Sequence, residues 1–410
     1  MPVCGGSKPV MSIAQAMNMN TAEQKIACDL DWWLAGCAAV LLYIGLVIIT
    51  SASIDIADAR TVGVDSSGSG NPFYYAMKHG VFLCLALTVA CVVIRVPTDW
   101  WCRNGWLLLF VSLALLVLVL VIGREVNGSI RWIGLGQVNF QPSEVAKLFL
   151  IAYLAGYLVR RNDEVTSSWW GFIKPMVVMF VAALLLLMEP DFGATVVILV
   201  AAFGMIFLSG AKLVRFGTLL MVATVLGVAL IFFQPYRFQR VISFANPWAD
   251  QFGSGYQLTQ ALIAFGRGEW FGVGLGNSVQ KLMYLPEAHT DFVFAILAEE
   301  FGLLGSIFVI SLFVVLVYRS MRIGRLCEAA GRYFSAYFAY GLSILIGFQA
   351  FINIGVNCGL LPTKGLTLPL VSYGGSSLIV SCALVSILLR IDLERKWAAG
   401  VTRPGLGRAR

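Results

Sequence analysis

Charged residues are scarce in this sequence. Asp, Glu, Lys and Arg together make up 12% of its 410 residues, whereas about 25% is usual for a soluble domain. Hydrophobic residues account for 59%, and the mean hydropathy is +0.83. So few charges cannot cover the surface of a water-soluble protein of this length. The composition therefore excludes a soluble globular protein and predicts a membrane protein.

Sequence patterns for several kinds of binding site are also missing. There are only two histidines, and the nine cysteines form no CxxC pair, so neither a zinc site nor a disulfide framework is predicted. The stretch "GRGEWFGVGLGNS" (266–278) is rich in glycine, but it lacks the GK[ST] ending of a nucleotide-binding P-loop. No small-residue cleavage site follows the weakly polar residues 1–31, so the first apolar run is predicted to be a signal anchor that is not removed.

Apolar runs of about 17 to 25 residues, long enough to cross a bilayer as helices, occur ten times. They lie at 32–52, 79–95, 105–122, 143–159, 172–188, 192–209, 213–233, 291–318, 333–356 and 373–390. The predicted fold class is therefore an all-α polytopic membrane protein with ten transmembrane helices. We divide the chain into an N-terminal tail (1–31), a transmembrane domain (32–392) and a C-terminal tail (393–410).

The distribution of Lys and Arg indicates how these helices are oriented. Most of these residues fall in segments that share one side of the membrane with both termini, which predicts that the N- and C-termini lie in the cytoplasm. The net charge of +7 follows largely from this bias. It points to anionic lipid at the cytoplasmic surface and not to nucleic acid.

One predicted outer segment, 234–290, is far longer than the others. Loops of such length within a compact bundle are usually functional. An amphipathic pattern follows Ser254, which stands at capping-box spacing from Gln257, and its apolar residues recur at i, i+3, i+4 and i+7: Leu258, Ala261, Leu262 and Phe265. We expect a helix here that lies on the outer membrane interface or against the bundle.

Ionisable residues gather at the predicted outer ends of the helices. A charge is costly at membrane depth, so each is a candidate functional group. The residues are Arg124, Glu125, Arg131, Glu144, Lys147, Glu189, Asp191, Arg237, Arg240, Glu287, His289, Asp291 and Lys364. Because both signs of charge meet on one side of the membrane, the cluster could bind a charged headgroup.

Several of these residues also have a structural interpretation. Asp291 opens the eighth predicted helix and could act only as an N-cap. A helix N-terminus lowers the pKa of a carboxylate, which disfavours a base unless burial raises that pKa again. Glu144 and Lys147 are spaced i, i+3 and could neutralise each other. His289 is more often a hydrogen-bonding neighbour than a base.

Glu299 and Glu300 lie deeper in the helix that Asp291 opens. Consecutive residues are about 100° apart around a helix, so these two carboxylates cannot face the same partner. We favour one of them paired to a cation and the other near polar backbone over a catalytic role for either.

Four stretches together resemble one known family. They are "RWIGLGQVNFQPSEVAKL" (131–148), "MEPDFGAT" (188–195), the segment from "YRFQRV" (236–241) to "EEFGLLG" (299–305), and "LPTKGLTLPLVSYGGSS" (361–377). On these stretches the chain resembles the SEDS family (shape, elongation, division and sporulation) over residues 32–392. The motif "PTKGLTLP", which contains Lys364 and Thr367, is typical of the cell-division branch.

The resemblance implies a ten-span fold and a peptidoglycan glycosyltransferase that polymerises lipid II at the outer face of the cytoplasmic (inner) membrane, at the division septum. The Asp of the "HTD" context is the proposed catalytic residue of the family, and it corresponds to Asp291. The substrate-binding residues carried over are Arg131, Glu144, Lys147, Asp191, Arg240 and Lys364, to which we add His289. The implied partners are lipid II, a class B penicillin-binding protein transpeptidase (FtsI type) and divisome subunits of the FtsQ, FtsL and FtsB type.

The implied reaction needs a base and cations. We expect Asp291 to take the proton of the attacking sugar hydroxyl, and Lys364, Arg131 and Arg240 to stabilise charge on the departing pyrophosphate. The sequence establishes no cofactor, but a divalent cation (Mg²⁺ or Mn²⁺) held by oxygen ligands would serve the same purpose. Two alternatives stay open: a lipid II flippase, and a non-catalytic scaffold for division proteins.

Overall fold

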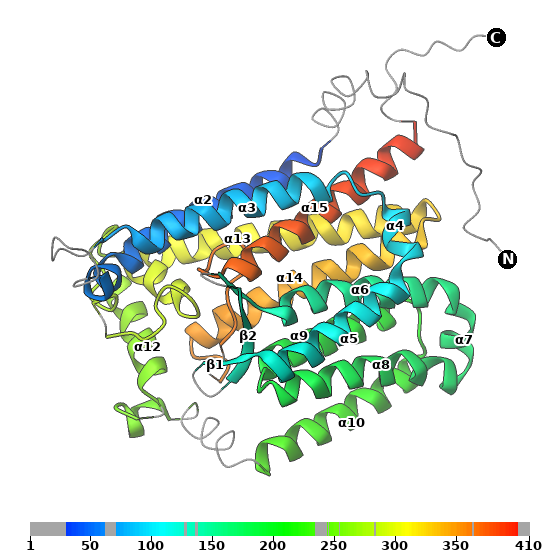
Figure 1. Ribbon diagram of the computed structural model, residues 1–410, viewed down its shortest axis with the longest axis horizontal. Coiled ribbons are helices and arrows are strands. Elements are labelled where there is room, and N and C mark those ends of the chain that lie inside the picture. The colour runs from blue at the N-terminus through cyan, green and yellow to red at the C-terminus, as the bar shows by residue number, and fades with distance from the viewer. Residues whose placement is uncertain are drawn as a thin grey trace, which may run out of the picture.

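The structure is a computed structural model that describes residues 30–61, 71–126, 129–135, 138–233, 244, 246–253, 255–282, 284–362 and 365–400. It is a bundle of long helices with a small sheet near one end (Figure 1). The helices are α2 (Trp32–Thr61), α3 (Tyr74–Val93), α4 (Thr98–Arg103), α5 (Gly105–Ile122), α6 (Pro142–Arg160), α7 (Asn162–Ser167), α8 (Trp169–Met188), α9 (Phe192–Leu208), α10 (Leu213–Phe232), the 3₁₀ helix η2 (Pro247–Asp250), α12 (Tyr256–Gly268), α13 (Val293–Ala329), α14 (Tyr333–Asn357) and α15 (Gly375–Ala398). The strands are β1 (Arg124–Val126), β2 (Ser129–Leu135) and β3 (Val138–Phe140).

The helices agree with the predicted membrane protein. In the part of the chain that the structure describes, eight helices are long and apolar enough to cross a membrane, namely α2, α3, α5, α6, α8, α13, α14 and α15. Helix α9 is apolar but shorter, with 17 residues, and α10 has 20 residues in the seventh predicted run. The prediction of a helical, polytopic membrane protein is confirmed, whereas the number of spans and their orientation stay predictions.

The small sheet is a correction to the all-α prediction. Strands β1, β2 and β3 pair antiparallel in that order, with Glu125 opposite Ile130 and Ile133 opposite Phe140. They fill the segment between α5 and α6, whose "NG" at 127–128 is a typical hairpin dipeptide. The sequence did not predict them because strands of three to seven residues are too short to show clear alternation beside long apolar helices. The sheet matters because β2 carries Arg131.

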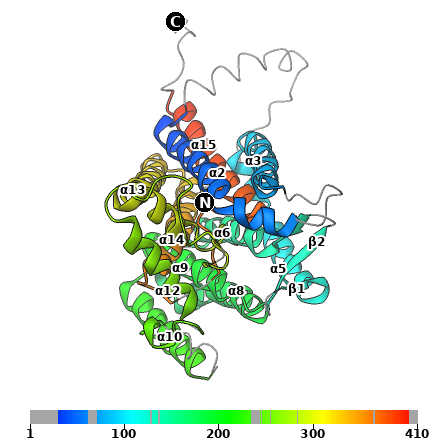
Figure 2. The ribbon, with the colours of Figure 1, turned by 90° about the vertical axis from the view of Figure 1, so that its left-hand side faces the viewer.

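The helices differ in how deeply they are buried, and the most buried ones carry the polar residues of the interior. Of the eight candidate spans, α6, α14 and α15 have the largest share of buried residues, and α3, α5 and α13 have the smallest. Helix α14 packs against α6, α9 and α13, and α10 lies at the edge of the bundle, away from α2 and α15 (Figures 1 and 2). Polar side chains that α6 and α14 direct toward each other are therefore shielded from both lipid and water.

The amphipathic helix predicted in the long outer segment is confirmed as α12. It packs against α13 and α14, and its Leu258, Ala261 and Ala264 are buried. Of the two places expected for it, the structure thus has it against the bundle. Its N-cap is Gly255, without a side-chain hydrogen bond, and Ser254, the predicted capping residue, lies outside the described residues.

Glu299 and Glu300 hold the chain that follows α12, as expected for structural groups. Glu300 accepts a hydrogen bond from Ser51 at 2.5 Å and lies 3.6 Å from the Lys281 ammonium. Glu299 accepts from the backbone N–H of Val279 at 3.1 Å and from that of Gln280 at 3.3 Å. Glu299 also lies 3.6 Å from the Arg267 guanidinium. Both carboxylates therefore face a cation, and Glu299 faces polar backbone as well. The structural role is as expected, but the assignment of one kind of partner to each carboxylate is wrong.

Helix α13 is interrupted just after these two residues. Gly302 has a φ of 66°, and a Cβ added there would lie 2.4 Å from the backbone nitrogen of Gly272. Backbone groups freed by the break pair with the neighbouring segment, since Leu303 N–H donates to the Glu269 carbonyl at 2.9 Å. A break in a membrane helix is tolerated where nearby backbone satisfies its polar groups in this way.

Candidate active site

Asp291 lies immediately outside the first turn of α13. The N-cap of α13 is Phe292, so Asp291 does not take the capping position that was the alternative to a catalytic role. Its side chain is half-buried, and it lies against Gly365, where an added Cβ would be 3.0 Å from the Asp291 Oδ2 atom and 3.8 Å from the Arg131 Nη1 atom. The carboxylate therefore lies close to the Arg131 guanidinium and to the backbone at Gly365.

The backbone of Asp291 is held by two amides of α14. Asn353 and Asn357 each donate a hydrogen bond to the Asp291 carbonyl, at 2.9 and 3.0 Å. Asn353 also donates to the Leu366 carbonyl at 2.6 Å, and Asn357 accepts from the Ala295 N–H at 3.0 Å. Both side chains are buried, where such bonds are costly to lose. They fix the start of α13 and the segment at Leu366 to one helix.

Sequence reasoning missed these amides, although a signal was present. Gln349, Asn353 and Asn357 stand four residues apart in an apolar span, so they share one helix face. Amides in a membrane helix are commonly interhelical hydrogen-bonding groups, and this spacing would have directed attention to that face.

Replacing Asn353 by Leu is expected to lower the turnover rate by about 10²-fold, because a displacement of reacting groups by about 1 Å has an effect of that order. The change removes the bonds to Asp291 and Leu366 while keeping side-chain size. The measurement is turnover of the purified variant with saturating substrate. The matched control is Ser343→Ala on the same helix, since the buried Ser343 hydroxyl bonds only the Ala339 carbonyl of its own helix among the described residues. Equal turnover in both variants would contradict a positioning role for Asn353.

The surroundings of Asp291 raise the pKa of its carboxyl to about 7. Burial is the largest cause, the negative charges of Glu287 and Asp191 act in the same direction, and the positive charge of Arg131 opposes them. A carboxyl that exchanges its proton near neutrality can accept one from a substrate hydroxyl. The raised pKa answers the objection that a helix N-terminus would make this residue too weak a base.

Arg131 and Asp191 are the charged groups of β2 and of the start of α9 that act on the Asp291 carboxyl. Strand β2 carries Arg131, whose Nη2 atom donates to the Pro190 carbonyl and whose Nη1 atom lies 3.9 Å from Asp191 Oδ1. Asp191 is the N-cap of α9 and accepts from the Ala194 N–H at 3.2 Å. The Arg131 side chain is 22% exposed, against 2% for Asp191. The guanidinium is thus the accessible partner, placed where an anionic group could reach it.

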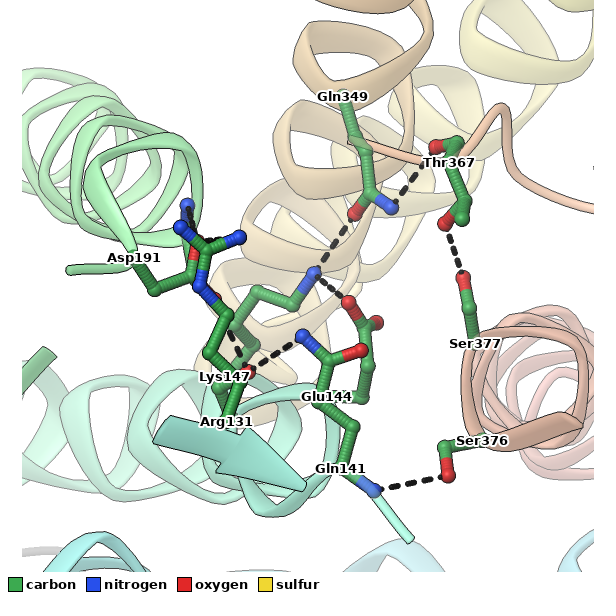
Figure 3. A network of polar contacts seen from close by, with 11 residues as sticks. Arg131, Gln141, Glu144, Lys147, Asp191, Gln349, Thr367, Ser376 and Ser377 are labelled. Carbon is green, nitrogen blue, oxygen red and sulfur yellow. Dashed lines mark hydrogen bonds and ion pairs between the residues drawn. The ribbon is translucent and has the colours of Figure 1, made fainter. Parts of the chain in front are cut away.

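Glu144 and Lys147 form a buried ion pair deeper in the bundle, as their spacing allowed. The Lys147 ammonium lies 2.8 Å from Glu144 Oε1 and donates to Gln349 Oε1 at 2.9 Å, and its side chain is fully buried. Gln349 in turn donates to the Thr367 carbonyl at 3.2 Å. Figure 3 shows this network reaching from α6 across α14 to the segment that precedes α15.

The same network reaches the Arg131 side of the site through Ser143. The Ser143 hydroxyl donates to Asp191 Oδ2 at 3.3 Å and accepts from the Gln141 amide at 3.1 Å. Gln141 also receives support from α15, since its N–H donates to Ser376 at 3.0 Å. Polar contacts therefore connect α6, α9 and α15 beneath the space that holds Asp291.

His289 has a different environment from the other predicted site residues. Its ring packs against Tyr75 and Tyr373, at centroid distances of 5.2 and 5.6 Å, and its carbonyl accepts from the Tyr373 N–H at 3.0 Å. The side chain is buried. A substrate-binding role for His289 stays a prediction, as do those of Arg240 and Lys364, which lie outside the described residues.

A metal centre is not apparent among the residues that the structure describes. No three His, Cys, Asp or Glu side chains of those residues are grouped to hold an ion. Asp191 and Asp291 act on each other electrostatically, but they supply only two carboxylates. The divalent cation considered from the sequence stays a prediction, and no chemical step is assigned to one.

Comparison with known proteins extends over nearly the whole chain. Residues 31–397 match the profile of the FtsW/RodA/SpoVE family, described as cell cycle proteins. A probable peptidoglycan glycosyltransferase FtsW of Hahella chejuensis is 57% identical over 381 residues, which are 92% of this chain and 94% of that protein. Its namesake in Pseudomonas fluorescens is 56% identical over 375 residues, 91% of this chain and 90% of that protein.

Solved structures show the same fold. A chain of a peptidoglycan synthase complex, described for its coordination of polymerization and crosslinking, superposes with a TM-score of 0.71 at 28% identity, over 89% of this chain and 98% of that one. The Rod shape determining protein RodA of Thermus thermophilus superposes with a TM-score of 0.65 at 28% identity, over 89% of this chain and 97% of that one.

Proposed function

The chain belongs to the FtsW/RodA/SpoVE family of cell cycle proteins, and we propose that it is a peptidoglycan glycosyltransferase that polymerises lipid II at the division septum. The observation that carries this proposal is the Asp291 carboxyl, whose pKa is raised to about 7, close to the Arg131 guanidinium. Relatives at 57% and 56% identity are named as peptidoglycan glycosyltransferases, which supports the same activity here.

The proposed reaction joins two lipid-linked saccharides. A hydroxyl of the acceptor sugar attacks the anomeric carbon of the donor, a new glycosidic C–O bond forms, and the C–O bond to undecaprenyl pyrophosphate breaks. Asp291 takes the hydroxyl proton as the bond forms. Arg131 faces the negative charge that develops on the pyrophosphate, with Lys364 and Arg240 as further candidate cations from the resemblance. Because pyrophosphate leaves without acid assistance, one carboxylate and direct inverting displacement suffice.

A ten-span arrangement with both termini in the cytoplasm is part of this proposal. Arg319 pairs with Asp31, which precedes α2, at 2.5 Å, and Arg332 and Arg390 pair with Glu394 near the end of α15. These arginines belong to the positively charged segments that the sequence assigns to the cytoplasm. Figure 1 has the end of α15 and the start of α2 on one side of the bundle and α12 with the sheet on the other. The site would then open at the outer face.

The proposed partners are proteins that crosslink and regulate the new glycan. A chain of similar fold comes from a complex described as coordinating polymerization and crosslinking. We therefore propose that a class B penicillin-binding protein transpeptidase of the FtsI type binds this chain, together with divisome subunits of the FtsQ, FtsL and FtsB type. The membrane face of the bundle, with exposed apolar residues on α3, α5 and α13, offers surface for single-span partners.

The rival functions are a lipid II flippase and a scaffold, and one experiment separates all three. The purified chain, alone and with its transpeptidase partner, is reconstituted in vesicles with labelled lipid II. Glycan strands resolved by electrophoresis are the expected product. Movement of lipid II between leaflets without strands would instead favour the flippase, and neither product in either preparation would favour the scaffold. Against the flippase, transporter sites lie near the membrane midplane between repeats, whereas Asp291 lies at one end of the bundle and the sequence has no visible repeat.

A further inference from the structure

Glu189 is a buried carboxyl that the proposed reaction does not use. It is the C-cap of α8, in the short turn before Asp191. Its side chain has no exposed surface, and neither carboxylate oxygen has a hydrogen-bond partner among the described residues. Buried polar groups are nearly always paired, and an ionised carboxylate without a partner is costly to bury. Such a carboxyl is either protonated, and so uncharged, or kept in the buried position for a functional reason.

The charged neighbours of Glu189 come from the site described above. The pKa of its carboxyl is raised to about 8: burial is the largest cause, the negative charge of Asp191 acts in the same direction, and the positive charge of Arg131 opposes them. Arg131 donates to the Pro190 carbonyl, next in the chain to Glu189, while its own Nε atom has no hydrogen-bond partner among the described residues. The nearest charges on α6, Glu144 and Lys147, are paired with each other.

These contacts allow two charge states in the turn. With Glu189 neutral, Arg131 and Asp191 compensate each other, and the partly exposed guanidinium can attract an anion from the open side. With Glu189 ionised, the turn carries one net negative charge, and Arg131 interacts electrostatically with a second carboxylate in addition to Asp191. The ionised Glu189 carboxylate would then repel an anion that approaches the site and would compete with it for the positive charge of Arg131.

We propose that Glu189 is a positioning residue that acts through Arg131: its protonation determines how tightly Arg131 holds the diphosphate of the lipid-linked donor. This inference rests on the proposed function, since it takes the diphosphate donor from it. Arg131 binds the diphosphate tightly when Glu189 is protonated and therefore neutral. The coupling is reciprocal. If protonation of Glu189 raises the affinity for the diphosphate by some factor, a bound diphosphate raises the proton affinity of Glu189 by the same factor.

The sign of the pH effect follows directly. As pH rises through about 8, Glu189 loses its proton and affinity for the donor falls. For one linked proton, the donor KM is expected to rise about tenfold between pH 7 and pH 9. Over the same range kcat at saturating donor changes by no more than about twofold, as Asp291, with a pKa of about 7, becomes fully ionised. If Glu189 only supported the fold, its replacement would change kcat, KM or stability, but it would not remove the rise of KM with pH.

The test compares Glu189→Gln and Glu189→Met with the wild type. Neither replacement can ionise, and both are close in volume to Glu, so both variants are expected to keep the wild-type donor KM at pH 7 and to hold it constant to pH 9. Glu164→Gln serves as the control, because Glu164 is a surface carboxylate paired with Arg161 and Lys174; its KM should rise with pH as in the wild type. Affinity for undecaprenyl pyrophosphate, measured directly at pH 7 and pH 9, gives a readout that does not need catalysis.

The outcomes separate this inference from the proposed function. A tenfold rise of KM that persists in either folded Glu189 variant would overturn the role of Glu189, as would a Gln variant that binds undecaprenyl pyrophosphate poorly at pH 7. Absence of glycan from the wild type would overturn the proposed function instead. The binding measurement would still decide whether Glu189 controls an anion site.

Discussion

The Asp291→Asn variant is expected to polymerise lipid II about 10² to 10⁴ times more slowly than the wild type, the range over which a positioned base accelerates proton transfer. Asparagine keeps the size of the side chain but cannot take a proton from the attacking hydroxyl. The measurement is the initial rate of glycan formation by purified protein with its transpeptidase partner.

Stability and insertion of this variant should be unchanged, and this makes the comparison interpretable. Asn353 and Asn357 hold the carbonyl of residue 291 and not its side chain, so their hydrogen bonds survive the replacement. Thermal unfolding in detergent provides the control. A variant that folds normally and polymerises at the wild-type rate would show that another group is the base.

The Lys147→Met variant is expected to lose about 3 to 5 kcal/mol of stability, the usual effect of removing one partner from a buried ion pair. Lys147 is fully buried between Glu144 and Gln349, so the replacement leaves the Glu144 carboxylate without its cation. The measurement is the free energy of unfolding in detergent, or the midpoint of thermal unfolding where unfolding is irreversible.

The matched control for Lys147 is the double variant Lys147→Met with Glu144→Gln. The double variant has no buried Glu144 carboxylate left without a cation, so it should regain much of the stability that the single variant loses. The two sites are in contact, and their effects should therefore not add. Equal stability of the single and double variants would contradict the view that this pair is a structural element beneath the site.

Regular patterns allowed much of the fold to be predicted. Long apolar runs placed the helices because a bilayer requires runs of about 20 residues, and the spacing of Leu258 and Ala261 predicted α12. Glu144 with Lys147 was predictable because both lie on one helix, where a separation of three residues brings side chains together. The different directions of Glu299 and Glu300, about 100° apart, followed from the same geometry.

The remaining features depend on contacts between distant segments. The hairpin that carries Arg131 consists of short strands, which leave little pattern in a sequence dominated by membrane helices. Asn353 binds both Asp291 and Leu366, a contact of three segments that no single-helix pattern contains. The burial of Glu189 likewise depends on how α8, α9 and β2 meet. Arg240 and Lys364, outside the described residues, still rest on the resemblance alone.

The central claim is that Asp291 is the general base of a glycosyltransferase, and its pH–rate profile tests this most directly. Loss of activity in a variant does not distinguish a base from a structural group, whereas a titration reports the ionisation itself. The measurement is kcat/KM for lipid II between pH 5.5 and 8, in the Glu189→Gln background so that Glu189 does not contribute. Because the base must be ionised, and the pKa of Asp291 is raised to about 7, kcat/KM should rise with pH to half its plateau value near pH 7. A profile that is flat over this range would contradict the account.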